Sequence, residues 1–142
     1  MAASPFASPC MLDTNALSEL IRNPQGILSQ RLNALEPDMV CTSIVAACEL
    51  RFGAQRKGSA PLTQRVEQLL LALTVLPLDT PADEHYADIR ATLERSGPPI
   101  GSHDLFIAAH ARSRGMTLLT RNLREFERVP GLTVEDWPSS AA

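Results

Sequence analysis

The fold is decided by a short stretch in which an apolar run passes directly into an amphipathic helix, CMLDTNALSELI at residues 10–21. Residues 10–12 are apolar throughout, which is typical of a strand buried on both faces. After Asp13 the apolar residues recur at helical spacing, at Ala16, Leu17, Leu20 and Ile21. A buried strand that feeds a helix indicates an α/β fold.

The same alternation continues along the chain. Further strands are predicted at residues 39–42, 74–76 and 117–120, with a short edge strand at 132–134. Helices are predicted at 27–35, 43–55, 61–73, 79–95 (capped by Asp79 or Thr80), 101–115 (ended by Gly115) and, as a single turn, 122–126. We therefore expect a three-layer αβα domain around a mostly parallel central sheet of four to five strands.

Length and composition exclude several classes of protein. The 142 residues have a formal net charge of -3 and are 44% hydrophobic, which describes one globular domain over residues 1–142 with frayed ends at 1–8 and 138–142. No apolar run approaches the roughly 18 residues of a membrane helix, and residues 1–9 lack a secretory signal, so we expect a cytoplasmic protein. Cys10, Cys41 and Cys48 lack metal-ligand spacing and are predicted to be buried.

Three acids and one amide are the candidate functional residues. Asp13 follows the first strand, Glu49 interrupts an apolar helical stripe, and Asp104 lies in the first turn of an apolar helix. Asn122 follows the strand at 117–120. Because sites in parallel sheets gather at the carboxyl ends of the strands, we expect the four side chains to converge. Taken singly, Asp13 and Asn122 are also consistent with helix caps, and Asp104 with a favourable first-turn acid.

A cluster of like charges is unfavourable unless a cation fills it. Hard oxygen donors without His or Cys suit Mg²⁺ or Mn²⁺ rather than zinc. Such an ion lowers the pKa of bound water and neutralises charge on a phosphate, which favours metal-dependent phosphodiester hydrolysis. Gly-rich phosphate-binding loops are absent from the sequence.

Two basic segments are candidate RNA-binding surfaces, or ordinary solvated faces. Residues 51–57 carry Arg51, Arg56 and Lys57 without an acid, and residues 112–128 carry five arginines, Arg121 among them, against the acids Glu125 and Glu127. Arg51 and Arg121 are predicted to contact the substrate. The remaining polar and aromatic candidates are interpreted as structural, with His103 facing away from the carboxylate beside it: His85, His103, His110, Tyr86 and Trp137.

Six segments resemble, in order and spacing, the PIN-domain ribonucleases of the VapC toxin branch: MLDTN (11–15), ACELRFGA (47–54), IGSHDLFIAAHA (100–111), TRN (120–122), REFERVPGL (124–132) and EDW (135–137). The resemblance implies that Asp13, Glu49 and Asp104 are metal-binding acids. It places Asn122 at a fourth position that is often Asp. By the same resemblance Thr14 and Ser102 lie beside the site and hold a water or a phosphate oxygen.

The resemblance also implies an activity and partners. VapC-like proteins are endoribonucleases that cut structured RNA such as tRNA, with Mg²⁺ as the expected cofactor and Mn²⁺ as a substitute. A cognate VapB-type antitoxin silences each of them, homodimers are usual, and DNA is reached only through the antitoxin. Two alternatives stay open: a PIN-fold RNA-processing nuclease outside toxin–antitoxin systems, and a catalytically weak binding module.

Overall fold

The computed structural model describes residues 9–137, so the ends expected to fray, 1–8 and 138–142, lie outside the described residues. Five strands form one sheet in the order β3-β2-β1-β4-β5, and each neighbouring pair is parallel. The strands are β1 (Cys10–Leu12), β2 (Val40–Ser43), β3 (Thr74–Leu76), β4 (Thr117–Leu119) and β5 (Val134–Glu135). The predicted parallel sheet is confirmed.

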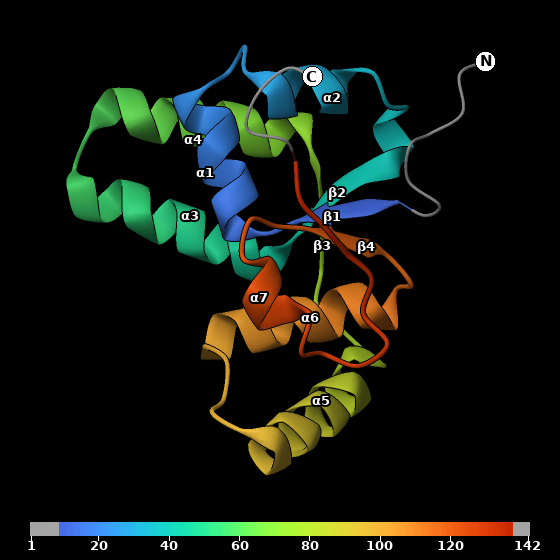
Figure 1. Ribbon diagram of the computed structural model, residues 1–142. Helices are drawn as coiled ribbons and strands as arrows, with labels where there is room; N and C mark the ends of the chain where they lie inside the picture. The colour runs from blue at the N-terminus through green and yellow to red at the C-terminus, as the bar shows by residue number, and fades with distance from the viewer. Residues whose placement is uncertain (1–8, 138–142) are drawn as a thin grey trace.

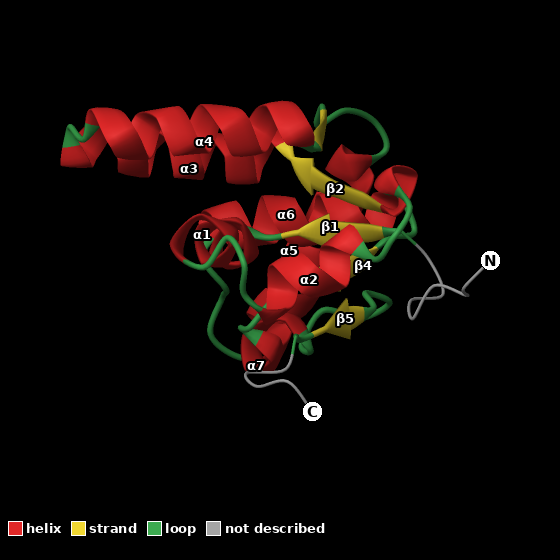
Figure 2. Cartoon of the chain, turned by 90° about the horizontal axis from the view of Figure 1, so that it is seen from above, coloured by secondary structure: helices red, strands yellow, loops and turns green. Residues whose placement is uncertain are grey.

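Helices cover both faces of the sheet (Figure 1). The helices on one side are α1 (Thr14–Arg22), α2 (Ile27–Asn33), α3 (Ile44–Lys57) and α4 (Ala60–Ala72), with a 3-10 turn at Pro37–Met39. On the other side lie α5 (Ala82–Ser96) and α6 (Ser102–Ser113), and the short α7 (Leu123–Phe126) follows β4. Figure 2 shows α3 and α4 extending together beyond the sheet. The three-layer αβα architecture is therefore as predicted.

Strand β1 is the centre of the sheet and sets the register of its neighbours. Met11 lies opposite Cys41 of β2 and Leu118 of β4, and all three residues of β1 are fully buried. Strands covered on both faces by helices need apolar side chains on both faces. This is why the sequence of β1 lacks alternation.

Side-chain caps and glycines fix the helix ends. Asp13, Ser43 and Ser59 accept hydrogen bonds from backbone N–H groups in the first turns of α1, α3 and α4. Gly58 follows the last residue of α3, and Gly115 lies two residues after the last residue of α6. Their φ angles of 65° and 64° are the left-handed conformation that terminates a helix. The predicted stop at Gly115 is confirmed.

Several predicted boundaries are wrong by one to three residues. The second strand begins at Val40 rather than Met39, because Met39 belongs to the 3-10 turn. Helix α5 begins at Ala82, and neither Asp79 nor Thr80 caps it with a side chain; instead the backbone carbonyl of Asp79 accepts from Ala82 N at 2.9 Å. The edge strand lies at 134–135 rather than 132–134.

The prediction of three buried cysteines is wrong for Cys48. Cys10 and Cys41 are buried, and burial raises the pKa of their thiols to about 12 and about 11. Cys48 is exposed on α3, where Ile44 and Phe52, four residues to either side, are exposed as well. These side chains form an apolar row on the outer face of α3, so the apolar context in the sequence does not mean burial.

Among the residues that the structure describes, no helix combines the length and the apolar character needed to cross a membrane. The apolar side chains are instead used in one core between the sheet and its helices, whose largest fully buried members include Phe126, Met11 and Leu17.

Replacing Leu118 of β4 with Ala should lower the free energy of unfolding by about 2–5 kcal/mol, because it leaves a cavity in a fully packed site. The matched control is Leu71→Ala, whose side chain is 85% exposed and should change stability by no more than about 0.5 kcal/mol. Urea denaturation measures both. Equal effects in the two variants would contradict the placement of the core.

Candidate active site

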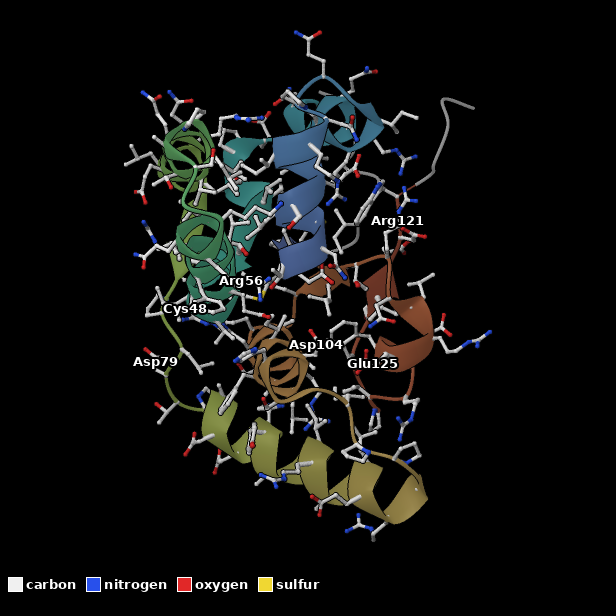
Figure 3. All side chains as sticks on the ribbon, turned by 90° about the vertical axis from the view of Figure 1, so that its left-hand side faces the viewer. Cys48, Arg56, Asp79, Asp104, Arg121 and Glu125 are labelled. Carbon is white, nitrogen blue, oxygen red and sulfur yellow. The ribbon has the colours of Figure 1, made fainter. Side chains whose placement is uncertain are left out.

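Four carboxylates meet beyond the carboxyl ends of β1 and β4. Asp13 follows β1, Glu49 lies on α3, Asp104 lies in the first turn of α6, and Glu125 lies on α7. Figure 3 shows Asp104 and Glu125 close together on these two helices. The parallel strands end at the same edge of the sheet, which brings together acids that are up to 112 residues apart in sequence, from 13 to 125.

Asp13 is the most buried of the four, with 2% of its surface exposed. Its Oδ1 accepts from Ala16 N at 2.8 Å, and its carboxylate also accepts from the hydroxyl of Thr120. Burial raises the pKa of Asp13, the charge of Glu49 raises it further, and hydrogen bonds from the Thr120 side chain and from the backbone of Ala16 and Asn15 oppose these effects. Asp13 is thus both the cap of α1 and a member of the carboxylate cluster, so the two interpretations of this residue are compatible.

Glu49 is half-buried, with 27% of its side chain exposed, and both of its oxygens have partners. Thr14 donates its hydroxyl to Oε1 at 2.8 Å. His103 Nδ1 lies 3.2 Å from Oε2. His103 was expected to face away from its neighbour Asp104, and it lies instead beside Glu49, because α6 packs against α3.

Asp104 experiences the charges of all the others. Burial, followed by the negative charges of Glu125, Glu49 and Asp13, raises its pKa to about 6, and only His103 acts in the opposite direction. Asp104 lies in the first turn of α6, a helix whose interior residues are buried. Asp104 is therefore the carboxylate for which a negative charge is most unfavourable, and the most sensitive to a compensating cation.

Glu125 is the member that sequence reasoning missed, since it appears there only as one acid within an arginine-rich segment. Its carboxylate accepts from Gly101 N at 3.2 Å and from the side-chain amide of Asn122. Asn122 makes no side-chain cap for α7, so it joins the site by holding Glu125. The available signal was spacing, because residues three apart lie on one side of a helical turn.

Thr120 is a second residue that sequence reasoning missed. It is fully buried, its hydroxyl accepts from Asn122 N at 2.9 Å, and it donates to Asp13. This one hydroxyl connects the loop after β4 with the acid after β1. A threonine at the end of an apolar strand gives no distinctive sequence pattern.

The predicted substrate-binding residues are placed differently from one another. Thr14 lies in the site, bonded to Glu49, whereas the exposed Ser102 borders a separate hollow of about 240 Å³ between α5 and α6. Arg51 pairs with Glu67 of α4. Arg121 lies 3.3 Å from Asp136, with its guanidinium 4.6 Å from the centre of the Trp137 ring, and Figure 3 shows it well apart from Asp104.

The other side chains interpreted as structural have packing or hydrogen-bonding roles. His110 is buried with Nδ1 2.7 Å from the hydroxyl of Ser43, and His85 Nδ1 accepts from Arg112 at 2.8 Å. Tyr86 stacks on Phe106 at 4.6 Å between centroids. Trp137 is buried.

The donor chemistry of the cluster fits a hard divalent cation, since it consists of carboxylate oxygens. Among residues 9–137, no three His, Cys, Asp or Glu side chains already stand as a closed set of metal ligands. Two of the acids are turned toward protein partners, Glu49 toward Thr14 and Glu125 toward Asn122. A bound cation would compensate the neighbouring negative charges and so lower the raised pKa of Asp104.

Comparison with known proteins gives consistent matches over nearly the whole chain. The PIN domain family model matches residues 10–132. A tRNA(fMet)-specific endonuclease VapC of Salmonella typhimurium is 44% identical over 129 residues, covering 89% of this chain and 96% of that protein. A Ribonuclease VapC2 of Haemophilus influenzae is 42% identical over 129 residues, with the same coverage of 89% and 96%.

Solved structures give the same result. DNA-bound VapBC from Salmonella typhimurium matches with a TM-score of 0.83 and 40% identity, covering 92% of this chain and 99% of that chain. VapBC2 from Rickettsia felis, bound to a promoter DNA fragment, matches with a TM-score of 0.85 and 29% identity, covering 91% and 98%.

Asp104→Asn should stabilise the metal-free protein at neutral pH. The pKa of Asp104 is raised in the folded state, so its contribution to stability is favourable at low pH and is lost as pH rises from about 4 to about 6. Asn stays neutral at every pH. We expect the variant's advantage in the free energy of unfolding to grow by about 1–2 kcal/mol between pH 4 and pH 7.5. Urea denaturation in EDTA measures this, and an advantage independent of pH would contradict the placement of Asp104.

Proposed function

This chain belongs to the PIN-domain family, within its VapC branch, and we propose that it is the toxin of a toxin–antitoxin pair that hydrolyses phosphodiester bonds of structured RNA. Its nuclease class follows from that membership. The observation that carries the proposal is the convergence of Asp13, Glu49, Asp104 and Glu125 on one edge of the sheet, with the pKa of Asp104 raised to about 6.

We propose Mg²⁺, with Mn²⁺ as a substitute, as the cofactor, held by Asp13, Glu49 and Asp104 with Glu125 beside them. The support is chemical, since the donors are hard oxygens whose charges repel one another. When bound, such a cation supplies charge neutralisation at the phosphate and lowers the pKa of a water ligand. It would also remove the electrostatic cost that the four carboxylates impose on the folded chain.

The protein's own contribution is to orient these acids. The cap bond to Ala16 N holds Asp13 rigidly at the start of α1. Thr14 and His103 hold Glu49, one at each oxygen, and Asn122 holds Glu125. Partners of this kind, outside the first layer of ligands, typically contribute 10–100-fold to metal affinity or activity. In this scheme Thr14 is a positioning residue for Glu49.

The RNA target is proposed from chemistry and from the names of relatives. The described residues of the site are carboxylates and their hydrogen-bond partners, a set that suits a phosphate bound through a cation. Two relatives, from Salmonella typhimurium and Shigella flexneri, are named tRNA(fMet)-specific endonucleases. Initiator tRNA is therefore the first probe to use, within a mixed tRNA pool.

Purified protein, free of antitoxin, should cut tRNA at one or a few sites in Mg²⁺ or Mn²⁺ and not in EDTA. Asp104→Asn should lower the rate at least about 100-fold, because loss of a ligand is expected to exceed the effect of losing one of its partners. Gel electrophoresis of end-labelled tRNA measures the rates. Urea denaturation shows that the variant is folded.

Three results would count against this proposal. Cleavage that persists in EDTA or in Asp104→Asn would remove the metal-binding role from these acids. Failure of the folded wild-type chain to cut any RNA in either metal would favour a catalytically weak binding module. A nuclease that cuts RNA but binds no antitoxin would favour RNA processing outside toxin–antitoxin systems.

We propose that a VapB-type antitoxin is the protein partner and that one of its helices binds an apolar groove formed by α1, α2 and α4. This groove has a volume of about 530 Å³ and includes Leu20, Leu32, Leu35, Leu69 and Leu73. None of the four carboxylates lines it. An apolar groove between helices suits the apolar face of an amphipathic helix. A basic side chain of the same antitoxin would then reach the acids.

Leu35→Glu should weaken antitoxin binding at least about tenfold and leave RNA cleavage unchanged, because it places an unpaired charge in the apolar groove. The matched control is Leu71→Glu on α4, since Leu71 is 85% exposed and does not line the groove. Titration calorimetry with the cognate antitoxin compares the two. Equal affinities would show that the antitoxin binds elsewhere.

Other expectations stay proposals. We place a nuclease that acts on cellular RNA in the cytoplasm, expect it to form a homodimer, and expect it to reach DNA only through its antitoxin. Structural relatives are described as VapBC bound to DNA, which supports the last of these.

A further inference from the structure

Another hollow, distinct from the apolar groove and from the hollow beside Ser102, opens next to the carboxylates. It lies between α1 and α3, and α4 closes its far side. Its volume is about 210 Å³. The polar side chains that line it are Thr14, Ser18, Arg22, Glu49, Arg56 and Lys57. Thr14 and Glu49 belong to both places, so this α1–α3 hollow is continuous with the proposed catalytic site.

The charges along the α1–α3 hollow change sign with distance from the carboxylates. Glu49 is the acid that lines it, and the other charged residues there are Arg22, Arg56 and Lys57. Arg22 is paired with Glu19 at 3.3 Å. Within the described chain Arg56 and Lys57 form no ion pair, and Arg56 instead lies over the ring of Phe52 at 5.6 Å. A cation–π contact leaves the guanidinium donors available to a ligand.

Helix α3 also carries a cation, Arg51, that is paired with an acid. Arg51, which the sequence predicts to bind substrate, pairs with Glu67 of α4 and does not line the hollow. Arg51 and Arg56 lie five residues apart, so they face different sides of α3. The prediction of a basic substrate surface on residues 51–57 is thus redirected from Arg51 to Arg56 and Lys57.

Gly53 keeps the hollow open. It lines the hollow one turn after Glu49, and a Cβ built at this position meets no atom within 4 Å. A larger side chain at Gly53 would therefore extend into free space without a steric clash. Since Gly weakens a helix interior relative to other residues, filling the hollow in this way should leave the fold intact.

We propose that the α1–α3 hollow binds the RNA backbone next to the bond that is cut, with Arg56 and Lys57 neutralising a phosphate there. The inference rests on the proposed function for its substrate. A cluster of four carboxylates repels a polyanion, so RNA needs cations close by to enter the site. Arg56 and Lys57 are the cations that lie in a hollow shared with Glu49 and that have no acid beside them.

The test compares the double variant Arg56→Gln/Lys57→Gln with the matched control Arg51→Gln, using tRNA(fMet) as the probe. In the double variant KM should rise about tenfold with kcat nearly unchanged. Binding of tRNA is measured separately in the Asp104→Asn background, where cleavage is expected to be at least about 100-fold slower. There the slope of log affinity against log salt should fall by about 0.7, because the two cations together neutralise one phosphate of a single strand. Arg51→Gln should match the wild type in both.

Gly53→Leu provides an independent arm because it fills the hollow and keeps both cations. It too should raise KM, with urea denaturation showing a folded protein. The proposal is overturned if the double variant and Gly53→Leu bind tRNA with wild-type affinity and salt slope, or if Arg51→Gln weakens binding as much as they do. It is also overturned if the variants lose antitoxin binding and keep RNA binding. A wild-type chain that binds tRNA but does not cut it contradicts the proposed function alone, and the binding arm still decides the role of the hollow.

Discussion

The parallel pairing of β1 with both β2 and β4 is the constraint on which the rest of the structure depends. Each strand of this trio ends at the same edge of the sheet, with Leu12 of β1 opposite Thr42 and Leu119. The residues that follow are therefore forced into one place, although they come from distant parts of the chain. Asp13 follows directly, Ser43 begins α3 and with it Glu49, and Thr120 leads to Asn122 and Glu125. Burial of β1 on both faces provides the free energy that holds this arrangement.

That free energy is needed because the carboxylates oppose one another. Burial and neighbouring negative charge raise the pKa of both Asp13 and Asp104. Hydrogen bonds from Thr14, Thr120 and Asn122 hold individual acids in place without removing the repulsion. The site is thus stabilised by the packing around it and destabilised from within. A functional site is where such a conflict between local energetics and the global fold is expected.

The sequence predicted what depends on local pattern and missed what depends on individual side-chain contacts. The strand–helix alternation, the parallel sheet and the convergence of Asp13, Glu49 and Asp104 follow from apolar periodicity and from one rule about strand ends. Glu125, Thr120 and the contact of His103 with Glu49 could not be predicted in this way, because each depends on how α6 or the loop after β4 packs against another element. The pairing of Arg51 with Glu67 could not be predicted for the same reason, since Glu67 lies on α4. The prediction that Cys48 is buried was wrong because its apolar neighbours on the helix, Ile44 and Phe52, belong to an exposed row of α3.

Helix α3 joins the two halves of the proposed reaction surface in a single rigid element. Glu49 and Arg56 are seven residues apart, which is two helical turns, or about 10 Å along the axis. An acid needed for a cation and a base needed for a phosphate would neutralise each other if they were in contact. The helix prevents this by fixing their separation. In addition, Glu49 accepts a hydrogen bond from Thr14, and the guanidinium of Arg56 lies over the ring of Phe52. The spacing lets both charges act on one RNA strand while the acid end of the site stays negative enough to attract a divalent cation.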